Sequence, residues 1–539
     1  MIVPPKGLVN LAVGAMSEYM AHRLRRANPG HAAQRHVFGK LTHGLAMSAF
    51  GRETGIEPEM AYETFRTRVT PRTYEMLVPY IERMKAGASG VLWPGRCPFF
   101  ALSAGTAGRA RYIPVNEEML AHFRKAGLHS LLYYAARVGH TGVLRGRHLL
   151  LGGTAHLTPL NNAGRQGPFA GDLSAIAAVN IPAWIEKHLY EPGPAIAQLG
   201  DWPAKLQAIA ERVLHRDITL LAGMPNWILA LGEVLRAGTA PGHTHPPRNL
   251  KALWPNLECY VHGGVPVAPF ADELRVTLGP DVNFHEVYPT SEGIIAAQDA
   301  DAASGLRLIV NAGLFFEFLP MTSFDQENLA HLGTKVVPLE GVRTGVDYAL
   351  LLTTPGGLCR YVVGDVVRFL ATDVPRLIYV GRTDLRLNAF GENVIEQEVT
   401  DALVAVCRRH GWSIVNLHVA PIFANTLTGQ LRGGHEWWVE LKVPTIETPT
   451  ANVLSPELDA ALMQRNGEYR TRRNGKVLES PVIRLVMPGV FEQWMKRNGR
   501  WGGHNKTPRC RSDRVVADQL AELSRFYIEA KPPYFIRRH

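Results

Sequence analysis

Apolar residues recur at helical spacing through most of the first hundred positions of the chain. In Tyr74–Met84 they lie three or four residues apart, which predicts a helix with one buried face. The apolar stretch Gly7–Met16 runs into charged residues, and this pattern predicts an amphipathic helix rather than a secretory signal.

From Phe99 onward the pattern changes to short apolar runs separated by helical stretches. His148–Leu151 and Ile218–Leu221 are typical of buried strands, and the second leads through Gly223 into a helix that begins near Asn226. Strands that alternate with helices predict an α/β fold with several sheets covered by helices.

A second change of pattern, near residue 381, indicates a domain boundary. Leu377–Gly381 is typical of a strand, a polar turn follows it, and Trp437–Val443 later alternates apolar and polar residues. We therefore expect a large N-terminal domain over residues 1–381 and a smaller α+β domain over residues 382–539.

The composition narrows the class of protein. The 539 residues are 46% hydrophobic and 20% charged, which is typical of globular proteins and excludes a disordered chain. The net charge of +10 favours anionic ligands, but the basic residues are scattered without interleaved aromatic residues, so we expect no nucleic acid as partner. No apolar run reaches the roughly 18 residues of a membrane span, so we expect no membrane partner.

Five cysteines stand far apart and form no CxxC pair: Cys97, Cys259, Cys359, Cys407 and Cys510. This spacing argues against a disulfide framework or a structural zinc site. We expect reduced, mostly buried thiols in a cytoplasmic protein.

The strongest candidate for chemistry is the run from Ser103 to Arg111, which is rich in glycine, alanine and hydroxyl residues. Small residues let the backbone approach a polyphosphate closely, and the hydroxyls of Ser103 and Thr106 can bind its oxygens. Arg109 and Arg111 add charged donors. No Gly-Lys-Ser/Thr follows, so this is not a Walker loop, and an ordinary polar hairpin turn is the alternative.

A second polar segment, Tyr288–Gly293, follows an apolar run and combines an aromatic ring, two hydroxyls and the carboxylate of Glu292. Hard oxygen ligands suit Mg²⁺, and the ring of Tyr288 offers a flat face to a nucleobase. The alternative is a helix N-terminus with Thr290 or Ser291 as its cap.

Two further segments each contain one charged residue that is a candidate for the functional site. Asp365 ends the hydrophobic stretch that follows Arg360, and its carboxylate can accept hydrogen bonds from both hydroxyls of a ribose. The alternative is a Gly-Asp turn at a strand end. Lys506 lies in His504–Arg509, where an exposed lysine is otherwise ordinary surface.

Taken in this order, these segments resemble those of adenylate-forming enzymes, and specifically of the Gretchen Hagen family of acyl-acid amido synthetases, the auxin-responsive family of plants with bacterial relatives. The resemblance extends over almost the whole chain. Phe50–Arg52 and Val69–Glu75 resemble the family's N-terminal segment. Ala222–Trp227 and Leu253–Asn256 resemble segments beside its acyl pocket.

The resemblance implies a large N-terminal adenylation domain, a mobile C-terminal domain, and ATP and Mg²⁺ as cofactors. It implies that Ser103, Gly105, Thr106 and Gly108 hold the β- and γ-phosphates, that Arg111 assists them, and that Tyr288 stacks on adenine. It further implies that Thr290 or Ser291 contacts the α-phosphate, that Glu292 holds Mg²⁺, and that Asp365 binds the ribose near Arg382. Asp384 corresponds to the hinge, Lys506 to the adenylation lysine, and Trp227, Gly263 and Gly264 to the acyl site.

The function implied is the activation of a small carboxylic acid as an acyl-adenylate, followed by transfer to an amine such as an amino acid. Coenzyme A or another acceptor is an alternative. A non-catalytic nucleotide-binding relative is another, because Ala104, Ala107 and Val362 stand where the family often has hydroxyl residues or arginine. The acid, the acceptor and the oligomeric state stay open.

Overall fold

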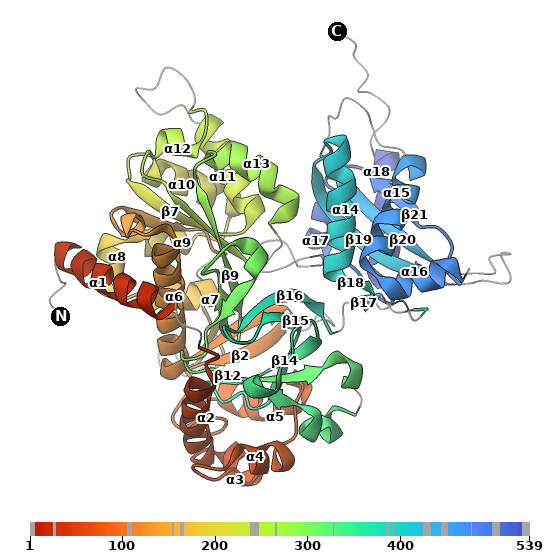
Figure 1. Cartoon of the computed structure of the whole chain (residues 1–539). Helices are drawn as coiled ribbons and strands as arrows, with labels where there is room; N and C mark the ends of the chain where they lie inside the picture. The colour runs from red at the N-terminus through yellow and green to blue at the C-terminus, as the bar shows by residue number, and fades with distance from the viewer. Residues whose placement is uncertain are drawn as a thin grey trace. The chain divides into compact units, whose positions relative to one another are not determined.

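The computed structural model is shown in Figure 1. It describes residues 6–24, 28–104, 110–153, 156–161, 167–237, 247–264, 267–326, 328–383, 386–387, 389–390, 392, 394–423, 433–442, 451–475, 477–498 and 507–530. The chain forms two compact units: unit 1 comprises Met1–Val267 and Ala271–Tyr379, and unit 2 comprises Ala268–Phe270 and Val380–His539. The roles of the domains expected over residues 1–381 and 382–539 stay predictions.

Unit 1 begins with the predicted helices, which are α1 (Lys6–Leu24), α2 (His31–Ala46), α3 (Ala49–Glu53), α4 (Tyr62–Arg68) and α5 (Tyr74–Lys85). In α5, Leu77, Ile81 and Met84 are buried at helical spacing, which confirms the predicted buried face. The predicted amphipathic stretch is helical within α1, but Leu11 and Met16 are exposed, so its apolar side chains do not all face the protein.

The largest sheet of the described residues has the strand order β13-β12-β14-β15-β16-β11-β10-β9-β8-β7-β3-β6. Its strands are β3 (Arg147–Leu150), β6 (Tyr190–Glu191), β7 (Ile218–Ala222), β8 (Cys259–Gly263), β9 (Asn283–Thr290), β10 (Gly293–Ala297), β11 (Leu306–Leu308), β12 (Phe315–Pro320), β13 (Val337–Pro338), β14 (Asp347–Thr353), β15 (Tyr361–Ala371) and β16 (Arg376–Arg382). Neighbours from β6 to β9 pair in parallel, and β9, β10, β11 and β16 pair in antiparallel fashion. Strands β3 and β7 confirm the two predicted buried strands.

Helices cover both faces of the parallel half of this sheet. Phe284 and His285 are neighbours on β9, so their side chains point to opposite faces. Tyr134 of α6 (Glu117–Val138) contacts the ring of His285, whereas Arg275 of α13 (Ala271–Leu278) lies over Phe284. The predicted α/β arrangement is therefore confirmed (Figure 1). The other helices of this region are α7 (Leu173–Val179), α8 (Ala183–His188), α9 (Pro194–Ala197), α10 (Trp202–Val213), α11 (Pro225–Ala237) and α12 (Leu250–Leu253).

A smaller sheet of unit 1 has the order β2-β1-β5-β4. It comprises β1 (Phe99–Ala104), β2 (Ala110–Val115), β4 (Thr158–Pro159) and β5 (Phe169–Gly171). β1 and β2 form an antiparallel hairpin, and β5 pairs with β1 in parallel.

Unit 2 is an α+β structure around the sheet β19-β20-β21. Its elements are β17 (Arg386–Leu387), β18 (Val394–Ile395), α14 (Glu396–His410), β19 (Ile414–Ile422), β20 (Gly434–Leu441), α15 (Ala451–Arg465), α16 (Gly467–Asn474), β21 (Val482–Val486), α17 (Val490–Arg497) and α18 (Val515–Ala530). Trp437 packs in a core with Leu403 and Leu458, whereas Trp438 packs with Trp494 and Leu520. Every residue of β20 is buried, because helices cover both faces of the sheet.

All five cysteines are buried and outside any disulfide, which confirms the expected buried thiols. Burial raises the pKa of Cys97, Cys359 and Cys407 to about 12, so these thiols stay protonated. None of the helices in the described part of the chain is long and apolar enough to cross a membrane.

Candidate functional site

The β1–β2 hairpin carries the first predicted segment. Ser103 pairs with Arg111 and Ala104 with Ala110, so the loop between them connects two antiparallel strands. The segment is thus a hairpin, and this geometry is compatible with a phosphate loop and with an ordinary turn. Gly105, Thr106 and Gly108 lie outside the described residues.

Arg111 is held at the base of this hairpin by helix α5. Its guanidinium lies 5.7 Å from the ring centroid of Tyr74, and its Nη2 lies 3.9 Å from Oε1 of Glu75. The hydroxyl of Tyr74 accepts a 2.7 Å hydrogen bond from the backbone N–H of Tyr112. The carboxylate of Glu75 is exposed and lies at the edge of ion-pair distance, so its pairing with Arg111 is weak.

The segment with Glu292 is a second hairpin, formed by β9 and β10. Thr290 pairs with Gly293, and Ser291 and Glu292 form the turn between them. The alternative of a helix N-terminus is therefore wrong, because the chain reverses into a strand and no helix follows. Thr290 Oγ1 donates a 3.1 Å hydrogen bond to the carbonyl of Gly293, which closes the turn. Glu292 is buried.

Tyr288 and Asp365 meet in the interior of unit 1. The hydroxyl of Tyr288 donates a 2.6 Å hydrogen bond to Oδ2 of Asp365, and the two residues are 6% and 5% exposed. The ring of Tyr288 also lies edge-on to Tyr379, with 5.8 Å between centroids. Two segments predicted to bind one nucleotide are thus in direct contact. The stacking of Tyr288 on adenine and the binding of ribose by Asp365 stay predictions.

Asp365 does not end its strand, so this expectation from the sequence is wrong. Strand β15 continues to Ala371, and its register against β14 shifts around Gly364, where the single residue Leu350 of β14 faces three residues of β15. Gly364 has a φ of 92°, a conformation that favours glycine. This bulge turns the Asp365 side chain away from the regular alternation of the strand.

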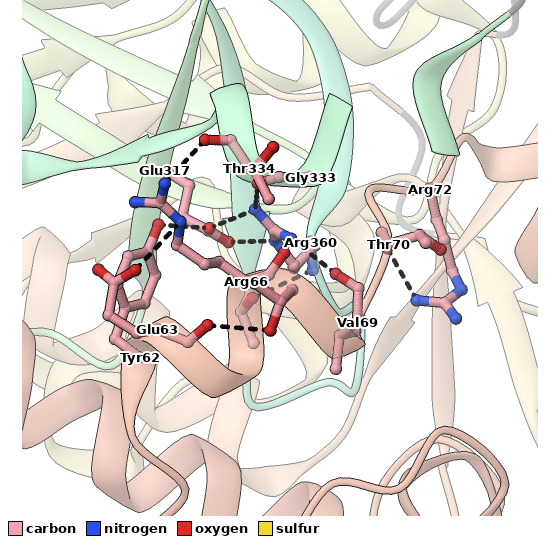
Figure 2. A network of polar contacts seen from close by, with 12 residues as sticks. Tyr62, Glu63, Arg66, Val69, Thr70, Arg72, Glu317, Gly333, Thr334 and Arg360 are labelled. Atoms are coloured by element: carbon pink, nitrogen blue, oxygen red, sulfur yellow. Dashed lines mark hydrogen bonds and ion pairs between the residues drawn. The ribbon is translucent and has the colours of Figure 1, made fainter. Parts of the chain in front are cut away.

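Sequence reasoning missed a buried polar network just before β15 (Figure 2). Nε and Nη2 of Arg360 lie 3.1 and 2.9 Å from the two carboxylate oxygens of Glu317. Nη1 donates to the carbonyls of Arg66 and Val69, and Nη2 donates to that of Gly333. All five guanidinium N–H groups are thus used. The sequence signal for this network was Glu317, a single charged residue within the apolar run of β12.

This network joins the N-terminal helices to the strand that carries Asp365. The hydroxyl of Tyr62 donates a 2.9 Å hydrogen bond to Oε1 of Glu317. The backbone N–H of Arg72 donates to the carbonyl of Arg360, and the N–H of Val362 donates to that of Arg72. The segment between α4 and α5 therefore lies along the start of β15.

The predicted acyl-site residues lie near the carboxyl ends of the parallel strands. Trp227 is buried in the first turn of α11 against the ring of Trp202, at 4.9 Å between centroids. A Cβ on Gly263 would lie 2.2 Å from the carbonyl oxygen of Val287, so the close approach of β9 requires glycine there. Gly264 follows at the exposed end of β8.

Three predicted residues belong to unit 2. Arg382 is the last residue of β16, and Asp384 and Lys506 lie outside the described residues. The residues that follow Lys506 are anchored on β19: Nδ1 of His418 donates a 2.7 Å hydrogen bond to the carbonyl of Pro508, and Val419 pairs with Cys510.

Family models match residues 25–283 as the GH3 family N-terminal domain, 307–382 as its central domain and 397–515 as its C-terminal domain. The chain belongs to the GH3 family. The family predicted from the sequence motifs is thereby confirmed.

Curated relatives of this GH3 chain are plant proteins. The probable indole-3-acetic acid-amido synthetase GH3.2 of Oryza sativa subsp. japonica is 26% identical over 580 residues, which cover 93% of this chain and 92% of that protein. The match to the indole-3-acetic acid-amido synthetase GH3.8 of Oryza sativa subsp. indica is 25% identical and covers 59% of this chain and 48% of that protein.

Solved structures share the fold of this GH3 chain. The AtGH3.15 acyl acid amido synthetase in complex with 2,4-DB superposes with a TM-score of 0.72 at 19% identity, covering 94% of this chain and 95% of that one. A 2-hydroxyisobutyryl-CoA ligase in its postadenylation state superposes with a TM-score of 0.55 at 15% identity, covering 90% and 91%. The predicted adenylate-forming fold, with a large N-terminal and a smaller C-terminal part, is confirmed.

Proposed function

We propose that this GH3 protein activates a small carboxylic acid with ATP and Mg²⁺ and transfers the acyl group to an amine, specifically an amino acid. The observation that supports the proposal most directly is the buried contact between Tyr288 and Asp365, since it joins two of the predicted nucleotide segments. The names of the relatives, which are amido synthetases, support an amine as acceptor.

The chemistry explains why ATP is needed. A carboxylate is a poor electrophile, because its oxygen is a poor leaving group. A carboxylate oxygen attacks the α-phosphorus of ATP, the bond to the bridging oxygen breaks, and pyrophosphate leaves. The amine nitrogen then attacks the acyl carbon, the bond to the AMP oxygen breaks, and the amine loses a proton. Catalysis of both steps rests on positioned charge and hydrogen-bond donors.

Glu292 would hold Mg²⁺, which when bound supplies positive charge against the phosphate oxygens. A buried carboxylate at a closed turn fits this role, since it offers a hard oxygen ligand at a defined position. No cluster of three or more His, Cys, Asp or Glu side chains that could hold a metal occurs among the described residues. The remaining ligands would therefore be phosphate oxygens and water, as is usual for Mg²⁺ in nucleotide sites.

The other roles follow the motifs. Ser103, Gly105, Thr106 and Gly108 would bind the β- and γ-phosphates with the help of Arg111, and Thr290 or Ser291 would contact the α-phosphate. Tyr288 would stack on adenine, and Asp365 would bind the ribose near Arg382. Trp227, Gly263 and Gly264 would line the acyl site, Asp384 would act as the hinge, and Lys506 would neutralise charge during adenylation. The cytoplasm stays the predicted location.

A screen of acids against amino acids and thiols tests the proposal, with pyrophosphate release and product mass as readouts. Pyrophosphate release together with an amide of the expected mass supports it. A thioester as the sole product contradicts the amine as acceptor. Binding of ATP without pyrophosphate release for any acid contradicts catalysis. Glu292→Gln serves as the matched inactive control.

A further inference from the structure

The imidazole of His122 joins helix α6 to the hairpin that carries Glu292. His122 is 2% exposed. Its Nε2 accepts a 3.0 Å hydrogen bond from the backbone N–H of Ile294, and its Nδ1 donates a 2.9 Å hydrogen bond to the carbonyl of Ala312. Ile294 is the second residue of β10 and follows Glu292 by two positions.

These partners determine the state of the ring. A backbone N–H can only donate and a carbonyl can only accept, so Nε2 carries the lone pair and Nδ1 the proton. Burial lowers the pKa of His122 to about 4, so the imidazole is neutral near pH 7. Both ring nitrogens are therefore hydrogen-bonded to backbone groups, Nε2 to the N–H of Ile294 and Nδ1 to the carbonyl of Ala312.

The turn of the hairpin packs closely against this ring. A Cβ on Gly293 would lie 2.8 Å from Nε2 of His122 and 2.6 Å from Cδ1 of Leu314. The glycine thus lets the turn reach the histidine. The turn is held from one side by His122 through Ile294, and across its own ends by the hydrogen bond from Thr290 to Gly293.

We propose that His122 is a positioning residue, which holds the turn Thr290–Gly293 through the N–H of Ile294 so that Glu292 keeps the position needed to bind Mg²⁺. The inference rests on the proposed function, because it takes Glu292 as the metal-binding residue. His122 acts through the backbone of β10 and not by contact with substrate. Loss of a group that hydrogen-bonds a metal ligand directly typically changes metal affinity or activity about 10–100-fold, and His122 acts one link further away, through the backbone N–H of Ile294.

The same helix offers a matched control. Lys125 lies one turn further along α6, and its Nζ donates a 2.6 Å hydrogen bond to the carbonyl of Asn311, beside Ala312. Lys125→Met removes a contact with the segment Asn311–Ala312, to which His122 also binds, but leaves the hydrogen bond between Ile294 and His122 in place. His122→Gln keeps one donor and one acceptor, whereas His122→Phe keeps only a ring of similar size.

The test uses the full-length protein and three measurements. Calorimetry measures the binding of Mg²⁺ with a non-hydrolysable α,β-methylene ATP analogue, hydrogen–deuterium exchange reports on the peptide that contains Ile294, and pyrophosphate release is measured against Mg²⁺ concentration. For His122→Phe we expect Mg²⁺ to bind about 10–100-fold more weakly, so that nucleotide binding and turnover both require a correspondingly higher Mg²⁺ concentration. We also expect faster hydrogen exchange at Ile294. We expect the KM for the acid to change less than about twofold, because the altered interaction is with the metal site. His122→Gln should retain most of the Mg²⁺ affinity and turnover that His122→Phe loses.

Three outcomes would overturn the inference: an unchanged Mg²⁺ requirement in His122→Phe, unchanged exchange at Ile294, or an equal shift in Lys125→Met. Wild-type protein that binds no magnesium nucleotide and releases no pyrophosphate overturns the proposed function instead. If His122→Phe does not fold, His122→Asn takes its place, since its shorter amide cannot reach both Ile294 and Ala312. The same expectations and the same contradicting outcomes apply to it.

Discussion

The hydroxyl of Tyr288 donates a hydrogen bond to Asp365 although β9 and β15 are separated by β10, β11 and β16 in the order of the sheet. Neighbouring strands of a sheet lie about 4.8 Å apart, so side chains four strands apart would not reach each other in a flat sheet, and the sheet must curve between β9 and β15. The hydrogen bond orients the buried carboxylate, and the bulge at Gly364 sets the direction of the side chain. An oriented, buried carboxylate is suited to bind a pair of hydroxyl groups.

Replacement of Asp365 by asparagine should raise the KM for ATP more than the KM for the acid. A hydrogen bond to a charged group contributes about 1.5–3 kcal/mol, so we expect roughly a 10–100-fold increase. Tyr288→Phe is the matched variant, since it keeps the ring and removes only the orienting hydroxyl, and it should raise the KM for ATP less. Initial-rate kinetics decide the matter, and an ATP dependence unchanged in Asp365→Asn would remove this residue from the ribose site.

Lys506→Ala should slow adenylation by roughly 10²–10³-fold, as expected when a charged donor to the transition state is lost. The reaction of preformed acyl-adenylate with the amine should be less affected. The two half-reactions are measured separately, by pyrophosphate exchange and by product formation. Lys496→Ala on α17 is the control, because that lysine forms an exposed ion pair with Glu492. Equal losses in both half-reactions would contradict the assigned role.

Arg360→Lys should destabilise unit 1. The ammonium group has three donors where the guanidinium uses five, so buried carbonyls and part of the Glu317 carboxylate lose their partners. Each unsatisfied buried group costs about 1–3 kcal/mol. Urea unfolding measures the loss, with Arg35→Gln as control, since the Arg35–Glu340 pair is exposed and contributes at most about 1 kcal/mol. Similar losses in the two variants would refute the importance of the buried network.

Buried histidines predict a loss of stability in acid. Burial lowers the pKa of His122, His262 and His418 to about 4 and that of His285 to about 3. The pKa of an unfolded histidine is about 6.5, so the unfolded state binds more protons between these values. The free energy of unfolding therefore falls as the pH drops from about 6.5 to about 4, by up to about 1.4 kcal/mol per pH unit for each histidine.

Melting temperatures between neutral and acid pH measure this slope. Nδ1 of His262 has no hydrogen-bond partner among the described residues, so phenylalanine can replace the ring without breaking a bond at that atom. His262→Phe should make the pH dependence shallower. A slope identical to that of the wild-type protein would show that His262 does not contribute.

Helices and strands with a local signal could be predicted. α5 shows apolar residues at helical spacing, and β3 and β7 are short apolar runs between turns, because periodicity depends only on residues within one or two turns. The alternation of apolar and polar residues in β20 is typical of a strand with one solvent-exposed face. In the structure helices from distant segments cover both faces of this strand, and its polar residues are buried as well.

Sequence by itself determined the α/β class, the order of the motifs and the family, since these depend on residue types and spacing along the chain. Tertiary structure decided which side chains meet. Tyr288 and Asp365 are 77 residues apart, Arg360 and Glu317 are 43 apart, and His122 and Ile294 are 172 apart. Such contacts depend on strand pairing, on the bulge at Gly364 and on helix packing, and no local pattern of residues encodes them.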